Sequence, residues 1–327
     1  MNCKNKSTII PAEIPTVDYE MAFFIDQYKE FNNTGLGKVP AVIENPVTKE
    51  FVVADEFENC IYFFDRDGEY LRRTGQKGQG PGDFMEPAIL AVDKDGDIYV
   101  YERLNMRVTI LSKEGDFITS FRAFLQNSSS IFVTDNKEIL TSAPRSDYFI
   151  TVYNREGEIL REIGRVPESI NKYRGRQSYK RGLPFYINNK YYIFLRWLRK
   201  VNIYDNDGNM IESIDATDIF RDYTIKDEYT PLEQTNNDPP WYPSKLFMGA
   251  FYSNGYFYIK SLPNIEDTNG IVVKLDQNLN IIKEYRFYGD YSPLRHISPR
   301  FIVYGEKDTF LLPTFNNASI IRMVESK

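Results

Sequence analysis

The side chains that could carry out chemistry are few in this sequence. There is one histidine, His296, so a zinc site built from several histidines is excluded. A hydrolytic triad would have to be built around His296 with a hydroxyl such as Ser298, and the sequence has no nucleophile elbow for it. His296 could also act as a general base, because an imidazole titrates near neutral pH. Asp55 and Glu102 are the carboxylates that could hold a divalent ion such as calcium.

Asp55 and Glu102 occupy the same place in two successive repeats, where each closes an apolar run and precedes a short polar corner. A residue type that recurs with a repeat is explained by architecture, since chemistry is needed once and a corner in every repeat. We therefore interpret both carboxylates as acceptors of backbone N–H bonds. This interpretation leaves no catalytic residue and no resident metal or cofactor, and calcium enters only if the chain is a hydrolase.

A second set of candidate residues is aromatic or cationic and falls in loops. Their rings and guanidinium groups offer flat faces and forked donors, which suit sugars, carboxylates or a protein surface. The alternative is that these loops are solvated and that their rings pack against the rim of the fold. The candidate ligand-binding residues are Trp197, Trp241, Tyr242, Arg196, Arg199, Tyr173, Arg174, Arg176, Tyr179 and Arg181.

The elements that must position these residues are β-strands arranged in repeats. A tight turn with glycine recurs at Gly68, Gly115, Gly157 and Gly208, at intervals of 42 to 51 residues. Glycine supplies the positive φ that such hairpin turns need. Runs rich in Val, Ile, Phe and Tyr surround each turn, and a period of this length indicates a propeller. The sequence predicts an all-β, six-bladed β-propeller of four-stranded antiparallel blades.

The last repeat is one strand short. It offers three apolar runs, at residues 299–304, 309–312 and 319–324, and propellers avoid an open edge by closing the ring. The apolar segment from Glu20 to Ile25 precedes the first blade, and we expect it to complete the last one. We therefore expect an N-terminal tether at residues 1–19 and a single domain at residues 20–327.

The second repeat carries the most specific motif. Residues 78–87 read Gly-Gln-Gly-Pro-Gly-Asp-Phe-Met-Glu-Pro, and residues 102–108 read Glu-Arg-Leu-Asn-Met-Arg-Val. This combination resembles the NHL repeat, and residues 20–324 resemble the six-bladed, NHL-repeat-containing lipoproteins of gut anaerobic bacteria. The resemblance implies a cell-envelope propeller and no particular activity. A strand follows the glycine run where a phosphate loop would open a helix, so we assign the run as a linker between blades.

Charge and the start of the chain bear on partners and location. The net charge is −6, which argues against nucleic acid as a partner, because phosphate binding needs a basic surface. The start, Met-Asn-Cys3-Lys-Asn-Lys, resembles the mature start of a bacterial lipoprotein and predicts a lipid on Cys3. Such a lipid would be the link to a membrane and would place the chain in the cell envelope. A free thiol at Cys3 would leave a cytoplasmic location open.

Strand connectivity sorts the loops between two faces. The corners between the second and third strands of a blade, and the linkers between blades, leave one face, which we call the long-loop face. The other turns leave the opposite, short-turn face. Insertions 164–182 and 215–245 fall on the long-loop face, and loops on a rigid scaffold are where binding residues concentrate.

Two hypotheses on function follow. The one we favour is a non-enzymatic module that binds a glycan, peptide or protein on the long-loop face. The alternative is a calcium-dependent hydrolase or lactonase with its site over the central channel.

Overall fold

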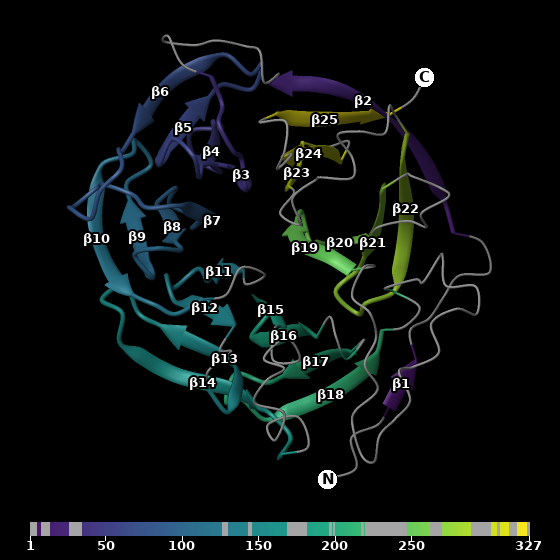
Figure 1. Ribbon diagram of the computed structural model, residues 1–327. Coiled ribbons are helices and arrows are strands. Elements are labelled where there is room, and N and C mark those ends of the chain that lie inside the picture. Colours follow the sequence, from purple (N-terminus) through teal and green to yellow (C-terminus); the bar gives the residue numbers. More distant parts are fainter. Residues whose placement is uncertain are drawn as a thin grey trace, which may run out of the picture.

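The computed structural model describes residues 5–7, 14–25, 35–125, 130–142, 146–168, 182–195, 198, 200–216, 219, 247–261, 270–288, 302–305, 308–313 and 319–325. These residues form an all-β propeller whose six blades stand around a central channel, as the sequence predicts (Figure 1). Among them, no helix is long and apolar enough to cross a bilayer.

Each of the first five blades contains four antiparallel strands that follow one another from the channel outward. Blade one contains β3 (Ala41–Glu44), β4 (Phe51–Asp55), β5 (Cys60–Phe64) and β6 (Tyr70–Thr74). Blade two contains β7 (Pro87–Val92), β8 (Ile98–Glu102), β9 (Arg107–Leu111) and β10 (Phe117–Arg122). Blade three contains β11 (Ile131–Val133), β12 (Ile139–Ser142), β13 (Tyr148–Tyr153) and β14 (Ile159–Arg165).

Blades four to six follow the same plan, with additions from the N-terminal segment. Blade four contains β15 (Gly182–Ile187), β16 (Lys190–Leu195), β17 (Lys200–Tyr204) and β18 (Met210–Asp215). Blade five contains β19 (Phe247–Ser253), β20 (Tyr256–Ser261), β21 (Gly270–Leu275) and β22 (Ile281–Tyr288). Blade six contributes β23 (Ile302–Tyr304), β24 (Thr309–Pro313) and β25 (Ile320–Glu325). The N-terminal strands are β1 (Asn5–Ser7) and β2 (Thr16–Ile25).

The turns between the third and fourth strands have the backbone that their glycines predict. Gly68, Gly115, Gly157 and Gly208 have φ angles between 82° and 102°. In blade five the equivalent turn places Leu279 at a φ of 65°, so a non-glycine residue takes the left-handed conformation there.

The core lies between neighbouring blades. The second and third strands are buried along their whole length in blade one, whereas the outermost strand β6 alternates between half-buried and exposed positions. This difference arises because inner strands are covered on both faces and outer strands on one. Aromatic rings fill much of the space, and Tyr62, Tyr99, Tyr191 and Tyr258 are among the largest fully buried side chains.

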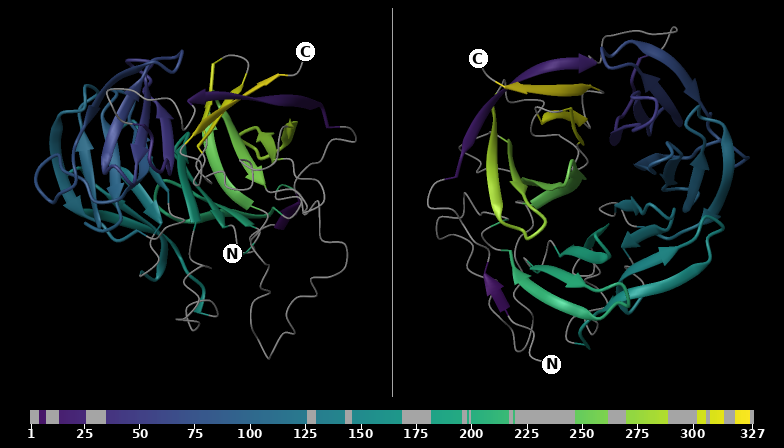
Figure 2. Two further views of the ribbon diagram at one scale, coloured as in Figure 1. Left: turned by 45° about the horizontal axis from the view of Figure 1, so that its top comes forward. Right: turned by 180° about the vertical axis from the view of Figure 1, so that it is seen from behind.

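The two N-terminal strands lie along the outer edges of three blades (Figures 1 and 2). β2 pairs antiparallel with β25, with Met21 opposite Met323, and its first half pairs parallel with β22 of blade five. β1 pairs parallel with β18 of blade four. Strand pairing thus begins at Asn5, and again at Thr16, within the segment that we expected to be a tether.

Contacts between loops agree with the assignment of each loop to the long-loop face or the short-turn face. On the short-turn face, the Asn45 amide donates to the Gly96 carbonyl oxygen of the next blade at 2.8 Å. On the long-loop face, the Arg103 guanidinium pairs with Glu56 of the preceding blade. The two corners that follow Asp55 and Glu102 are therefore neighbours on one face.

Candidate functional site

The described residues include two of the site residues that we predicted from sequence, Asp55 and Glu102. The other predicted residues lie outside the described part of the chain, so their contacts stay predictions. They are His296, Cys3, Trp197, Trp241, Tyr242, Arg196, Arg199, Tyr173, Arg174, Arg176, Tyr179 and Arg181.

Asp55 joins the corner of blade one to the linker that enters that blade. Its carboxylate accepts N–H bonds from Gly37 at 2.6 Å and Lys38 at 3.1 Å in the linker. It also accepts N–H bonds from Phe57 and Glu58 in the corner, both at 3.0 Å. Four backbone donors therefore surround this fully buried carboxylate.

Glu102 has the equivalent position in blade two and a different set of donors. Its carboxylate accepts hydrogen bonds from the Met85 N–H at 3.1 Å, the Asn105 amide at 2.5 Å and the Thr109 hydroxyl at 2.5 Å. The fourth donor is the Arg107 guanidinium, at 2.6 Å. The acid, asparagine and arginine of the blade-two motif therefore meet at one point.

Arg107 also explains the glycine linker that precedes blade two. Its guanidinium donates to the carbonyl oxygens of Gln79 at 2.8 Å, Gly80 at 3.2 Å and Asp83 at 2.7 Å. The linker also folds closely on itself, since a Cβ on Gly78 would lie 2.4 Å from the Asp83 carboxylate. The spacing between the glycine linker and Arg107 thus lets one arginine side chain bind three carbonyl oxygens of the linker.

These contacts leave little capacity for a metal ion at either carboxylate. Within the described ranges, no three His, Cys, Asp or Glu side chains are grouped as a metal site requires. What Asp55 and Glu102 do instead is fix two corners that stand side by side on the long-loop face.

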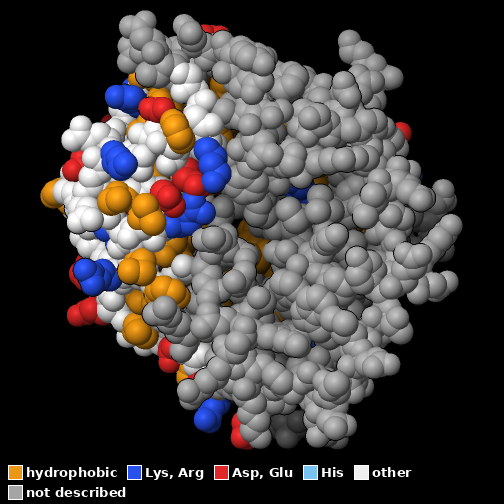
Figure 3. Space-filling model, viewed as in Figure 1, with side chains coloured by type: hydrophobic (Ala, Val, Ile, Leu, Met, Phe, Trp, Pro, Cys, Tyr) orange, Lys and Arg blue, Asp and Glu red, His pale blue; other side chains and the backbone are white. Residues whose placement is uncertain are grey.

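The two corners expose large apolar side chains. Phe57 is 75% exposed, Leu104 56% and Met106 46%, and we call these three residues the corner surface. In Figure 3, hydrophobic side chains lie beside acidic and basic ones on the coloured part of this face. Sequence analysis missed the corner surface, because an apolar residue in a corner can point inward or outward.

Ion pairs join the two corners to each other and to the neighbouring linkers. Arg103 pairs with Glu56 and, at 3.0 Å, with Glu86 of the linker, and Lys38 pairs with Glu56 at 2.7 Å. Glu56 is only 9% exposed, so these pairs are partly shielded from water and help to hold the corners in place. The corner surface is therefore carried on a rigid base.

Met106 has a strained backbone. Its φ is 49°, and the equivalent corner residue in blade one is Asn59, with a φ of 55°. Asparagine tolerates this left-handed region, whereas the backbone of a residue such as methionine is less stable there. Strain of this kind is found at functional positions when the surrounding structure enforces it.

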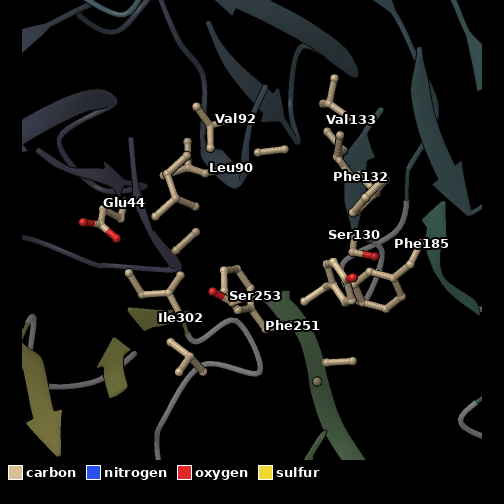
Figure 4. A pocket seen from close by; sticks show the side chains of 18 of the residues that line it. Glu44, Leu90, Val92, Ser130, Phe132, Val133, Phe185, Phe251, Ser253 and Ile302 are labelled. Carbon is tan, nitrogen blue, oxygen red and sulfur yellow. The ribbon is translucent and has the colours of Figure 1, made fainter. Parts of the chain in front are cut away.

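A second feature is a cavity of about 390 Å³ in the central channel. The innermost strands of all six blades line it, and most of the lining side chains are apolar (Figure 4). Glu44, Lys49, Ser130, Ser253 and Asn254 are among its polar residues. In sequence these residues look like ordinary strand ends, so the lining could not be recognised without the ring.

A buried lysine near the long-loop end of blade five was also missed. Lys260 is 1% exposed, and burial lowers its pKa to about 7. In the sequence it stands within the run Tyr-Phe-Tyr-Ile-Lys-Ser, where a lysine is expected to point to solvent.

Comparison with known sequences supports the fold. The DUF5128 family, described as a 6-bladed beta-propeller, matches residues 43–159, which is about a third of the chain. Protein brain tumor of Drosophila melanogaster is 26% identical over 127 residues, or 38% of this chain. The match covers 12% of the fly protein, so the chain spans about an eighth of that relative's length.

Solved structures share the same architecture at low identity. A Bacteroides fragilis protein named as exported has a TM-score of 0.57 and 11% identity, with 95% of this chain and 100% of that chain covered. Virginiamycin B lyase from Staphylococcus aureus has a TM-score of 0.56 and 12% identity, with 94% and 100% covered. The Cps50 (Swd1) β-propeller domain of Myceliophteria thermophila has a TM-score of 0.56 and 9% identity, with 94% and 100% covered. At these identities the likeness extends to the fold alone.

Proposed function

We propose that this chain is a non-enzymatic binding module of the bacterial cell envelope, which engages a protein or peptide partner through its long-loop face. The observation that carries the proposal is the corner surface: Phe57, Leu104 and Met106 are exposed on two rigid, adjacent corners. Large apolar side chains exposed on neighbouring corners are the kind of surface that marks interaction sites on soluble proteins.

The composition of the corner surface favours a protein or peptide over a glycan. Aromatic residues, methionine and arginine are enriched in protein interfaces, and Arg103 of the blade-two corner pairs with Glu56 of the corner that carries Phe57. Sugars need several hydrogen-bonding groups, whereas the nearby charged groups Glu56, Glu86 and Lys38 are already paired. A glycan ligand would instead rely on the predicted loop residues such as Trp197 and Trp241.

The proposed location rests on the expectation that Cys3 carries a lipid. The Bacteroides fragilis protein named as exported has the same fold, which supports an exported propeller. Cys3 is two residues from Asn5, which pairs with β18. A lipid on Cys3 would therefore hold the outer edge of blade four toward the membrane.

Site-specific photo-crosslinking tests the proposal in intact cells of the organism that makes the chain. A photoreactive phenylalanine analogue at position 57 is expected to give a discrete adduct, and Leu104→Ser with Met106→Ser should reduce the adduct at least fivefold. The matched control is Ile159→Ser with Leu160→Ser, since these side chains are 60% and 45% exposed on the outer strand of blade three. An adduct of equal yield from a probe at position 159 would contradict the proposal.

Substitution of Trp197 and Trp241 tests, in the same experiment, whether the predicted loops belong to the binding site. Trp197→Ala with Trp241→Ala should remove the adduct without lowering the melting temperature if the predicted loops share the site with the corner surface. Retained crosslinking would restrict the binding site to blades one and two. Calcium-dependent hydrolysis of esters or lactones by the purified chain would favour the enzymatic alternative.

A further inference from the structure

The chain adds extra strands to the outer edges of its own blades. β1 pairs parallel with β18 from Ser213 to Asp215, and β2 pairs parallel with β22 from Glu284 onward. Both pairings begin five residues after the left-handed residue of the preceding short turn, which is Gly208 in blade four and Leu279 in blade five. In two blades, a further strand thus binds at the same place on the outermost strand.

β10 of blade two has the same kind of edge as β18. Both strands have six residues and the same succession of exposed, half-buried and buried positions. Ser120 comes five residues after the turn residue Gly115 and corresponds to Ser213 of β18. β10 is the outermost strand of blade two (Figure 1), and no strand of the described ranges pairs with its outer edge.

The backbone groups of β10 that point away from β9 follow from the register of the two strands. Opposite residues of antiparallel strands alternate between pairs that exchange hydrogen bonds and pairs that do not. Ala123 donates its N–H to the Met106 carbonyl oxygen at 3.0 Å, so Ser120 and Arg122 lie in the pairs that exchange none. Their N–H and C=O groups therefore point to the open edge. The N–H of Glu284, at the position equivalent to Ser120, donates to the carbonyl oxygen of the residue before β2 at 2.9 Å.

The outer edges of blades one and three differ from this edge, although neither carries a further strand among the described residues. β6 ends one residue after Arg73, the position equivalent to Ser120. β14 contains Gly164, whose φ of 72° turns the backbone at the position equivalent to Arg122. Both strands also carry charged side chains, which protect an edge from pairing, whereas residues 117–121 of β10 are uncharged. β10 is therefore the open edge best suited to accept a strand.

β10 ends beside the corner surface. The hydrogen bond of Ala123 joins the end of the strand to Met106, and Leu104 belongs to the same corner. A strand parallel to β10 runs from the short-turn face to the long-loop face, so the residues after its paired part lie at the corner surface. Backbone pairing gives affinity for an extended sequence, and side-chain contacts give specificity. β1 is itself polar, with the sequence Asn-Lys-Ser, and pairs in this way.

We propose that the partner binds as an extended peptide that adds a fifth strand to blade two. The peptide pairs parallel with β10 at Ser120 and Arg122 and then places apolar side chains on Leu104 and Met106. This inference rests on the proposed function, because it takes the corner surface as the partner's site. It specifies what the partner presents, which is an extended segment with a free backbone edge.

Photo-crosslinking in the same intact cells tests where the peptide lies. The photoreactive phenylalanine analogue at position 118 is expected to give an adduct with the same protein as the analogue at position 57, as identified by mass spectrometry. The matched control is position 160 of β14, since Leu160 is 45% exposed and Ile118 is 43% exposed. We expect no adduct with this protein from position 160.

Proline substitutions test the backbone pairing. Ser120→Pro and Arg122→Pro each remove an N–H that points away from β9. Each should reduce the adduct from position 57 about fivefold, the effect of one hydrogen bond, while circular dichroism verifies the fold. The matched controls Ser120→Ala and Arg122→Ala remove the same side chains and keep the N–H groups, so they should leave the adduct unchanged.

The outcomes distinguish this inference from the proposed function. If position 57 gives an adduct and position 118 gives none, strand addition is wrong while the corner surface keeps its partner. The same conclusion follows if both proline variants fold and leave the adduct from position 57 undiminished. No adduct from position 57, or an equal yield from position 160, would overturn both proposals.

Discussion

Glu102 is fully buried and accepts hydrogen bonds from four donors, one of which is the Arg107 guanidinium. The neutral amide of glutamine cannot accept as strongly and brings its own N–H groups toward Arg107 and Asn105. We expect Glu102→Gln to lower the free energy of unfolding by about 1.5–3 kcal/mol, the range for hydrogen bonds to charged groups. Urea denaturation at neutral pH measures this change.

The matched control is Glu114→Gln, because Glu114 is 59% exposed and lies 3.9 Å from Lys113. An exposed pair of this kind contributes little, so its loss should change the free energy of unfolding by less than about 0.5 kcal/mol. If Glu102→Gln keeps full stability and abolishes a metal-dependent hydrolysis, Glu102 is a metal ligand and the structural interpretation is wrong.

The role of some single residues could be predicted from the sequence, and the role of others could not. Asp55 and Glu102 could be found because they recur with the repeat, and recurrence distinguishes an architectural acid from a catalytic one. Phe57 and Met106 could not be found, because the orientation of a corner residue depends on the neighbouring linker. The lining of the central channel could not be found either, since it is formed by six strands that are far apart in sequence.

Among the elements, β2 forms the seam between blades five and six. The Tyr19 ring packs edge to face on Tyr285 of blade five at 5.6 Å and on Phe310 of blade six at 5.4 Å. Its hydroxyl donates to the backbone carbonyl oxygen of Asp308 at 3.2 Å. One side chain of the N-terminal strand thus contacts both blades that it joins.

Asp308 adds a charged group to this seam. Its carboxylate accepts hydrogen bonds from the Tyr258 hydroxyl at 2.6 Å, from Lys274 at 2.8 Å and from the Tyr285 hydroxyl. Burial alone raises the pKa of Asp308, but the bonds from Lys274 and the two tyrosines outweigh it, so the net shift is downward. The folded state therefore favours the ionised carboxylate.

The direction of this shift predicts how stability depends on pH. A depressed pKa in the folded state stabilises the protein above the unfolded pKa of about 3.9, and this contribution is lost as the pH falls through the folded pKa. We expect Asp308→Asn to be least stable relative to the wild type at neutral pH, with the difference shrinking between about pH 5 and pH 3. Urea denaturation across this range measures the difference.

The control for this prediction is Asp116→Asn at an exposed position of a short turn. Its stability should follow the wild type at every pH. A difference between Asp308→Asn and the wild type that stays constant with pH would show that Asp308 acts only through packing.

The blades were predictable as elements and the N-terminal strands were predictable only in part. Each blade has its own apolar runs and a turn that requires a positive φ, so local sequence suffices. The segment Glu20–Ile25 is apolar and could be recognised as a strand. β1 has the sequence Asn-Lys-Ser and pairs through its backbone. It has no alternation of apolar and polar residues from which a strand could be predicted.

At the scale of the whole molecule, the ring depends on a strand that comes from the opposite end of the chain. β2 lies between β22 and β25, and it joins blades five and six into one continuous eight-stranded sheet. Without β2, the outer edges of β22 and β25 would present unpaired N–H and C=O groups, which promote aggregation. β1 adds only three residues to the outer edge of blade four and does not join that blade to another.

Two truncations separate these roles. Removing residues 1–13 deletes β1 and Cys3, and we expect the melting temperature to fall by less than about 4 °C, the effect of roughly 1 kcal/mol in a chain of this size. Removing residues 1–25 also deletes β2, and we expect a broad, less cooperative thermal transition with soluble oligomers on size exclusion. A synthetic peptide of residues 14–25 should restore a cooperative transition to the longer truncation. If that truncation instead melts like the full chain, ring closure does not depend on β2, and the seam at Tyr19 and Asp308 contributes packing without holding the propeller shut.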